Sequence, residues 1–239
     1  MIDIHCHILP AVDDGALNWE TTLEMCRLAL ADGITHIVAT PHANHRYVYD
    51  RERHQDILEE LKVRVPNLRF SLGADFHLSE SNIRDAIANP SRYTIGESPY
   101  VLVEFSDYQT PRQMLDQLSN LNSAGLQTIV THPERNLVVA QYTDLPEQFV
   151  NSGSFLQITA DSLTGAWGRG PRTMCESLLR KGLVSFIASD AHDTQNRRPI
   201  LSKARKAASR VVGATVAAQL VEDNPLILLN SSLNSQVFA

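Results

Sequence analysis

Short apolar runs alternate along the chain with longer segments whose apolar positions recur at helical spacing. Seven runs have the length and composition of buried strands, at residues 2–5, 36–40, 69–74, 100–105, 127–131, 155–159 and 184–189. Amphipathic segments lie between them, near residues 19–31, 53–63, 80–88, 112–124, 144–151 and 171–181. Regular alternation of strand and helix is typical of a parallel sheet covered by helices. The pattern therefore predicts an α/β barrel of about seven strands.

The same pattern predicts the domain organisation. No linker rich in proline, glycine and serine interrupts the alternation, which favours one domain at residues 1–230 over two smaller ones. One or two further helices are expected after residue 199, and residues 231–239 have the composition of a polar C-terminal tail. Glycines suited to left-handed C-terminal caps follow three of the predicted helices, at Gly33, Gly125 and Gly182.

Composition narrows the classes of function and the compartment. A formal charge of -6 without a block of lysine and arginine argues against binding to nucleic acid. The first residues enter a strand without a secretory leader, and no apolar run reaches the roughly 18 residues that cross a bilayer, so we expect no membrane insertion. Cys6, Cys26 and Cys175 lack the paired spacing of disulfide or zinc-finger frameworks. These features predict a cytoplasmic protein.

Histidines and carboxylates recur at the carboxyl ends of the predicted strands. His5 and His7 lie two residues apart at the end of the first strand, where side chains project to one side and can converge on one ion. The loop behind this strand adds Asp13 and Asp14, and the ends of five other strands add His42, Asp75, Glu104, His132, Asp190 and His192. In parallel barrels these ends share one mouth.

A single buried histidine or aspartate is more often a hydrogen-bonded core group than a metal ligand. Five histidines and four carboxylates in one mouth, however, would be severely uncompensated without cations, because neighbouring carboxylates cannot all stay ionised in a small space. Nine such groups also exceed the needs of one ion. Mixed imidazole and carboxylate ligands suit zinc, iron or manganese.

Several of these motifs together resemble the polymerase and histidinol phosphatase (PHP) superfamily, whose members hold two or three metals in a distorted (β/α)7 TIM-like barrel. The motifs are HCH, DDG, TPH, the glutamate of the fourth strand, THPER and SDAH. Within that superfamily, MIDIHCHILPAVDDGA, HIVATPHA and THPERN resemble bacterial manganese-dependent protein tyrosine phosphatases of capsule and exopolysaccharide operons. The likeness extends from Met1 to the segment NPLILLN.

This resemblance implies nine metal ligands: His5, His7, Asp14, His42, Asp75, Glu104, His132, Asp190 and His192. They would hold two or three divalent ions, with manganese implied by the family and zinc or iron as alternatives. One position departs from the family pattern, because Asp75 stands where glutamate is usual, with His77 and Glu80 nearby but out of register. A side chain one methylene shorter could alter the spacing of the metals.

The chemistry implied is hydrolysis of a phosphate monoester by a hydroxide formed on the metals, which also neutralise the phosphate oxygens. Arg135 and Arg197 follow strand ends and could bind phosphate oxygens in a bidentate way, although Arg198 could take the place of Arg197. A surface salt bridge is the ordinary role of an arginine. The mouth location and the resemblance favour phosphate binding for Arg135.

Cysteine-based phosphate chemistry is disfavoured by the sequence. A cysteine phosphatase needs an arginine six residues after its nucleophile, and the residues at that distance from the three cysteines are Val12, Asp32 and Lys181. The chain also lacks a GxSxG nucleophile elbow. Cys6 alternates away from its histidine neighbours and is expected to be a packing residue.

The leading hypothesis is a protein tyrosine phosphatase whose partner is the tyrosine-rich tail of a bacterial tyrosine autokinase that controls polysaccharide export. Histidinol phosphate or another small phosphomonoester is the alternative substrate within the same chemistry. A regulatory PHP module without activity is a further alternative, which the near-complete ligand set disfavours. An exonuclease domain is disfavoured by the acidic balance.

Overall fold

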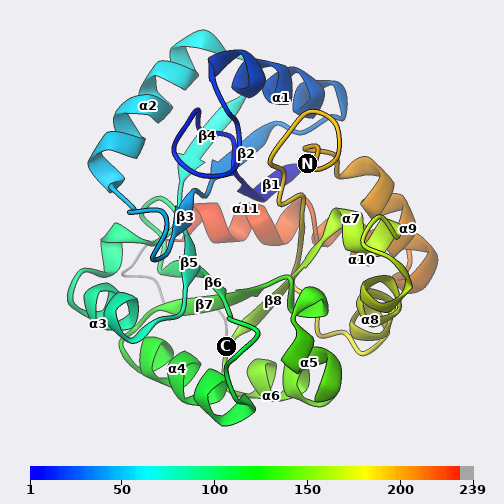
Figure 1. Cartoon of the computed structure of the whole chain (residues 1–239). Helices are drawn as coiled ribbons and strands as arrows, with labels where there is room; N and C mark the ends of the chain where they lie inside the picture. The colour runs from blue at the N-terminus through cyan, green and yellow to red at the C-terminus, as the bar shows by residue number, and fades with distance from the viewer. Residues whose placement is uncertain (232–239) are drawn as a thin grey trace.

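Nine parallel strand segments form two sheets in the computed structural model, which describes residues 1–231 (Figure 1). The three-stranded sheet has the order β1 (Ile2–Cys6), β2 (His36–Ala39) and β4 (Arg69–Leu72). The six-stranded sheet has the order β3 (His42–Ala43), β5 (Asp75–His77), β6 (Tyr100–Glu104), β7 (Gln127–Thr131), β8 (Phe155–Thr159) and β9 (Phe186–Ala188). The prediction of a parallel α/β fold is therefore confirmed.

Two of the seven expected strands are each broken into two pieces, which gives the nine segments. The second strand divides into β2 and β3 at Thr40 and Pro41, where proline has no amide to donate to a ladder. The third divides into β4 and β5 at Gly73 and Ala74. The pieces stay in step, because Gly73 N donates to Ala39 O at 2.9 Å and the Asp75 amide donates to Pro41 O at 3.1 Å. Each break lets its strand pass from one sheet to the other.

The end of β1 lies beside the segment that follows β9. The amide of Asp190 donates to His5 O at 2.8 Å, and the amide of His7 donates to Ala191 O at 2.9 Å. At the opposite end of β1 a different segment intervenes, because the Ile2 amide donates to Val221 O at 2.8 Å. The first and last strands thus meet directly only at the end that carries the predicted ligands, which distorts the barrel.

Helices surround the strands on their outer side (Figure 1). Those that join successive strands are α1 (Trp19–Ala31), α2 (Arg51–Arg64), α3 (Glu80–Ala88), α4 (Pro111–Ser123), α5 (Leu137–Gln141), α6 (Leu145–Asn151), α7 (Ala160–Thr164) and α8 (Arg169–Arg180). Two short 3-10 helices are η1 (Pro90–Arg92) and η2 (Pro133–Arg135). The sequence pattern did not predict α5 and α7, because each spans only five residues.

The chain after β9 forms α9 (Ser202–Val212), α10 (Ala214–Gln219) and α11 (Asp223–Asn230). Figure 1 shows α11 behind the strands, near the centre of the view. Gly33, Gly125 and Gly182 have φ angles of 85°, 89° and 69°, as predicted for helix C-termini. The expected tail at residues 231–239 lies outside the described residues apart from Ser231.

Two apolar clusters follow from the alternation of side chains along the strands. Alternate residues of β6 divide between them: Tyr100 and Leu102 join the smaller cluster, whereas Val101 and Val103 join the larger one. The smaller cluster also includes Leu228 of α11 and fills the space enclosed by the strands. The larger cluster packs the strands against the surrounding helices. Among residues 1–231, no helix has the length and apolar composition that a bilayer crossing requires.

Candidate metal centre

The two histidines of the HCH motif face the cluster because β1 changes phase. Ile4 belongs to the inner apolar cluster, whereas Cys6 belongs to the outer one, and the register of β1 against β2 shifts between Asp3 and Cys6. Both imidazoles therefore turn to the side on which Ile4 lies, and His5 Nε2 and His7 Nε2 lie 3.2 Å apart. This confirms the predicted convergence of the pair and the predicted packing role of Cys6.

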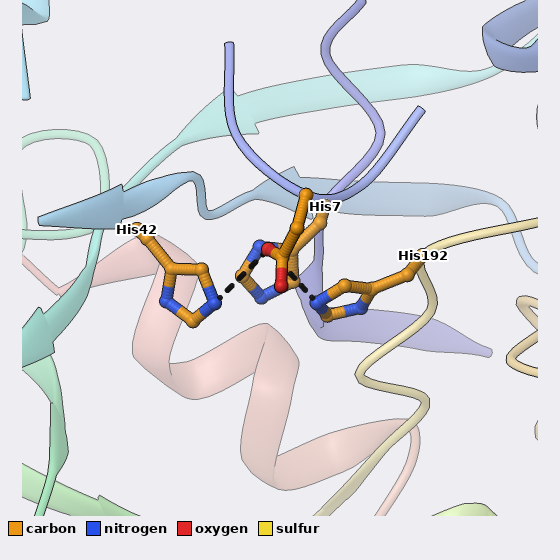
Figure 2. Close-up of side chains that lie close together, drawn as sticks. His7, His42 and His192 are labelled. Carbon is orange, nitrogen blue, oxygen red and sulfur yellow. Dashed lines mark ion pairs between the residues drawn. The ribbon is translucent and has the colours of Figure 1, made fainter. Parts of the chain in front are cut away.

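One group of four side chains gathers residues from three separate segments of the chain. His7, His42 and His192 surround a carboxylate in Figure 2, where dashed lines mark its ion pairs. That carboxylate belongs to Asp14, whose Oδ1 lies 3.3 Å from His42 Nε2 and 3.6 Å from His192 Nε2. One potential ligand atom from each of the four residues falls within 4.8 Å of the others. This spacing is compatible with a shared cation.

Two further groups overlap the first and meet at Asp75. His5 and His7 form one group with Asp75, and His42 and Glu104 form another with it. Asp75 Oδ2 lies 3.0 Å from His42 Nδ1 and 3.7 Å from His5 Nε2. The shorter aspartate at this position therefore still reaches the middle of the cluster.

His132 and Asp190 lie beside these groups. His132 Nε2 is 3.6 Å from Glu104 Oε1, and Asp190 Oδ1 is 3.4 Å from His5 Nε2 and 3.5 Å from His7 Nε2. Both residues adopt left-handed backbone conformations, with φ of 34° for His132 and 52° for Asp190. Such conformations are uncommon outside glycine and concentrate at functional sites. The structure thus brings all nine predicted ligands into one cluster, although their role as ligands stays a prediction.

The electrostatics of the cluster fit a bound cation. The carboxylate of Asp75 is only 1% exposed, and the imidazoles of His42 and His5 lie beside its Oδ2 atom. Burial lowers the pKa of His42, but hydrogen bonds with Asp14 and Asp75 outweigh it and raise the pKa to about 11. The cluster therefore favours positive charge at this point. A buried carboxylate beside a second carboxylate, Glu104, is costly unless cations offset the charge, so a divalent ion would stabilise this arrangement.

Other histidines are held in the neutral form that binds metals. Burial, together with the charge of His192, lowers the pKa of His7 to about 4. Burial and the charge of Arg135 lower the pKa of His132 well below its usual range. At neutral pH both imidazoles are unprotonated and can offer a lone pair.

Three residues outside the predicted ligand set support it. Asp13 Oδ2 lies 2.7 Å from His7 Nδ1, and Gln157 Oε1 lies 2.8 Å from His5 Nδ1, so each orients an imidazole whose other nitrogen faces the cluster. Gly15 cannot carry a side chain, because a Cβ would lie 2.1 Å from His7 O. For Gln157 the sequence did offer a signal. Residues 155–159 were the one predicted strand without a candidate ligand, and a glutamine stands in the middle of this apolar run.

Both predicted phosphate-binding arginines reach the cluster at Asp190. Arg135 Nη2 and Arg197 Nη2 lie 2.5 Å and 2.6 Å from Asp190 Oδ2. Burial would raise the pKa of Asp190, but His5 and the two guanidinium groups hold it well below its usual range. The half-exposed ring of Trp167, which sequence analysis missed, lies 4.6 Å from the Arg135 guanidinium carbon and 5.8 Å from that of Arg197. The aromatic ring therefore contacts both cations.

The alternatives left open by the sequence are resolved by position. Arg198 lines a separate surface pocket with Asp161, so Arg197 is the arginine that faces the cluster. Glu80 is exposed and pairs with Arg84 on α3, away from the site. His77 Nδ1 lies 3.9 Å from Glu104 Oε2 at the edge of the cluster.

Cys6→Ala is expected to keep most of the activity toward an aryl phosphate. The thiol is fully buried, and burial with the charge of Asp3 raises its pKa well above the usual range, so thiolate is not available at neutral pH. Steady-state kinetics with matched metal content test this expectation. A folded, metal-loaded variant without activity would contradict it and indicate thiol chemistry.

Comparison with known proteins decides the family. Residues 1–230 match the family of capsular polysaccharide synthesis proteins CpsB/CapC. The chain belongs to this family. It is similar to the putative tyrosine-protein phosphatase CapC of Staphylococcus aureus, with 33% identity over 99% of this chain and 94% of the relative. It is also similar to the tyrosine-protein phosphatase YwqE of Bacillus subtilis strain 168, with 31% identity and the same coverage of both chains.

Solved structures agree with the CpsB/CapC assignment. A structure from the study of YwqE of Bacillus subtilis and CpsB of Streptococcus pneumoniae, described there as unique metal-dependent tyrosine phosphatases, superposes with a TM-score of 0.86. It shares 31% identity and covers 97% of this chain and 95% of that one. A histidinol phosphate phosphatase of Lactococcus lactis has a TM-score of 0.60 at 12% identity, over 88% of this chain and 93% of that one, a likeness of fold alone. The predicted PHP-type fold is confirmed.

Proposed function

We propose that this chain is a metal-dependent phosphatase that hydrolyses phosphotyrosine on a protein. The observation that carries the proposal is the position of two guanidinium groups, Arg135 and Arg197, on the carboxylate that also meets His5 and His7. Phosphate-binding cations and potential metal ligands therefore border the same small space. The names of the relatives support tyrosine phosphate as the substrate.

The overlap of the three ligand groups supports two or three divalent ions, and we propose manganese as the physiological metal. The three groups are linked, because His7, His42 and Asp75 each belong to two of them. The remaining predicted ligands would complete the coordination: His5, Asp14, Glu104, His132, Asp190 and His192. Bound divalent ions would supply positive charge to the phosphate oxygens and a water of lowered pKa.

The residues of the chain would orient the substrate and preserve this arrangement. The two guanidinium forks would bind non-bridging phosphate oxygens, and their contact with Trp167 would limit their rotation. Asp13 and Gln157 would keep the imidazoles of His7 and His5 in fixed orientations. Phenolate leaves more easily than an alkoxide, so an aryl ester places less demand on a general acid.

We further propose that the substrate is the tail of a bacterial tyrosine kinase that regulates capsule or exopolysaccharide synthesis. Membership of a capsular polysaccharide synthesis family supports this partner. We place the reaction in the cytoplasm, in keeping with three cysteines that are buried and free.

A rate comparison tests the substrate class. Manganese-loaded protein is expected to hydrolyse a phosphotyrosine peptide at least tenfold faster, in kcat/KM, than a matched phosphoserine peptide or histidinol phosphate. The aryl leaving group and the peptide backbone would both favour the first substrate. Preference for histidinol phosphate would contradict the proposal and indicate a small-molecule phosphatase.

A further inference from the structure

A partly apolar groove of about 650 Å³ opens beside the candidate metal centre. One wall is η2 and α5, with Leu137 and Ala140, and the other is α8 with Met174 and Ser177. Figure 1 shows α5 and α8 beside each other to the right of the strands. Arg135 lines the groove and also reaches Asp190 in the cluster. A ligand bound at Arg135 can therefore continue directly into the groove.

We propose that this groove holds the segment of the substrate protein next to its phosphotyrosine. This inference rests on the proposed phosphatase function. It commits to an extended peptide that places an apolar side chain against Leu137 and Met174. It also places a negative charge near the basic ends of α8.

Exposure of the apolar side chains supports an occupant of this kind. Leu137, at the start of α5, is 62% exposed and lines the groove. On α8, residues 170, 173, 174, 177 and 181 recur at the spacing of a single helix face, and all five line the groove. Met174 is the apolar side chain among these five, so Leu137 and Met174 together offer a small apolar contact beside the mouth.

Charge supports a phosphorylated or acidic partner. The lining includes Arg169 at the start of α8 and Lys181 at its end, in addition to Arg135. Although the whole chain carries a formal charge of -6, these cations lie on the side of the mouth where a peptide would leave. Complementary charges at the rim would favour encounter with an acidic segment.

The dimensions match a short peptide. The twelve residues of α8 span about 18 Å at 1.5 Å per residue, and an extended chain advances about 3.3 Å per residue. The groove can therefore accommodate about five residues.

Two variants alter the groove without altering the predicted catalytic groups. Leu137→Asp removes the apolar contact, and Ser177→Trp fills the groove from α8, where Ser177 is exposed. Val63→Asp is the matched control, because Val63 is 81% exposed on α2, outside the groove. For each variant, kcat/KM is measured with p-nitrophenyl phosphate and with phosphotyrosine peptides that carry leucine or alanine beside the phosphotyrosine.

We expect both groove variants to lower kcat/KM for the leucine peptide about tenfold, while p-nitrophenyl phosphate changes less than twofold. Arg169→Glu should lower kcat/KM for acidic peptides about threefold and leave kcat/KM for neutral peptides unchanged. Unchanged peptide kinetics in both groove variants, or an equal loss for peptide and p-nitrophenyl phosphate, would overturn the inference. A change of oligomeric state in Leu137→Asp would overturn it in favour of a contact between copies of this chain.

A binding measurement separates this inference from the phosphatase function. Trp167 contacts Arg135, and Trp19 is the only other tryptophan in the sequence, so a Trp19→Phe background reports on the mouth by fluorescence. A peptide with a non-hydrolysable phosphonate in place of the phosphate is expected to bind about tenfold more weakly to Leu137→Asp in that background. Equal affinities refute the groove whatever the activity, whereas failure of the metal-loaded protein to hydrolyse p-nitrophenyl phosphate refutes only the function.

Discussion

Asp190→Asn is expected to lower kcat/KM for an aryl phosphate about 10³-fold, equivalent to about 4 kcal/mol of transition-state stabilisation. The Asp190 carboxylate is nearly fully buried and lies within 3.5 Å of His5, His7 and both arginines. Loss of its charge would weaken cation binding and leave two guanidinium groups unpaired at one point. Steady-state kinetics with measured metal content test both effects.

The same substitution should preserve the backbone. Asp190 has a φ of 52°, and asparagine tolerates this left-handed conformation well. Thermal unfolding is therefore expected to show a folded variant. Asp116→Asn is the control, because Asp116 is exposed on α4 and 68% of its side chain is accessible. A folded Asp190→Asn protein with wild-type kinetics would remove this carboxylate from the mechanism.

Removal of metal is expected to lower the activity more than 100-fold and to destabilise the fold. A metal at a free concentration of about 100 times its dissociation constant stabilises the folded protein by about 2.7 kcal/mol. For a chain of this size, that corresponds to a rise in Tm of about 5–10 °C. Exhaustive chelation followed by addition of manganese should reverse both changes. Elemental analysis of the reloaded protein gives the number of ions.

Two histidines close together in the chain provide a matched comparison for this experiment. His42→Asn removes a side chain shared by two of the ligand groups, and should reduce both the manganese-dependent rise in Tm and the recovered activity. His45→Asn changes an exposed histidine three residues further on, and should leave both responses intact. Full activity after exhaustive chelation, or equal responses from the two variants, would contradict a catalytic metal centre.

The positions of the strands along the chain and the location of the site could be predicted from local sequence patterns. Runs such as 127–131 and 155–159 were predicted with the bounds that the structure shows, because a buried parallel strand has a continuous apolar composition. The histidines and carboxylates could be placed in one mouth because parallel strands align their carboxyl ends. Short elements such as α5 and the split of strands at Pro41 and Gly73 were not predicted, since five residues or fewer carry little periodicity.

The sequence by itself determined which chemical groups stand at the strand ends, and its motifs were sufficient to predict the family. These features depend on residue type and on spacing along one segment. Only the tertiary structure decided which groups meet: the phase change in β1 that turns both His5 and His7 toward the cluster, the contacts of Gln157 and Trp167, and the choice of Arg197 over Arg198. Such contacts join residues far apart in the chain, and they depend on loop conformation and packing that no local pattern encodes.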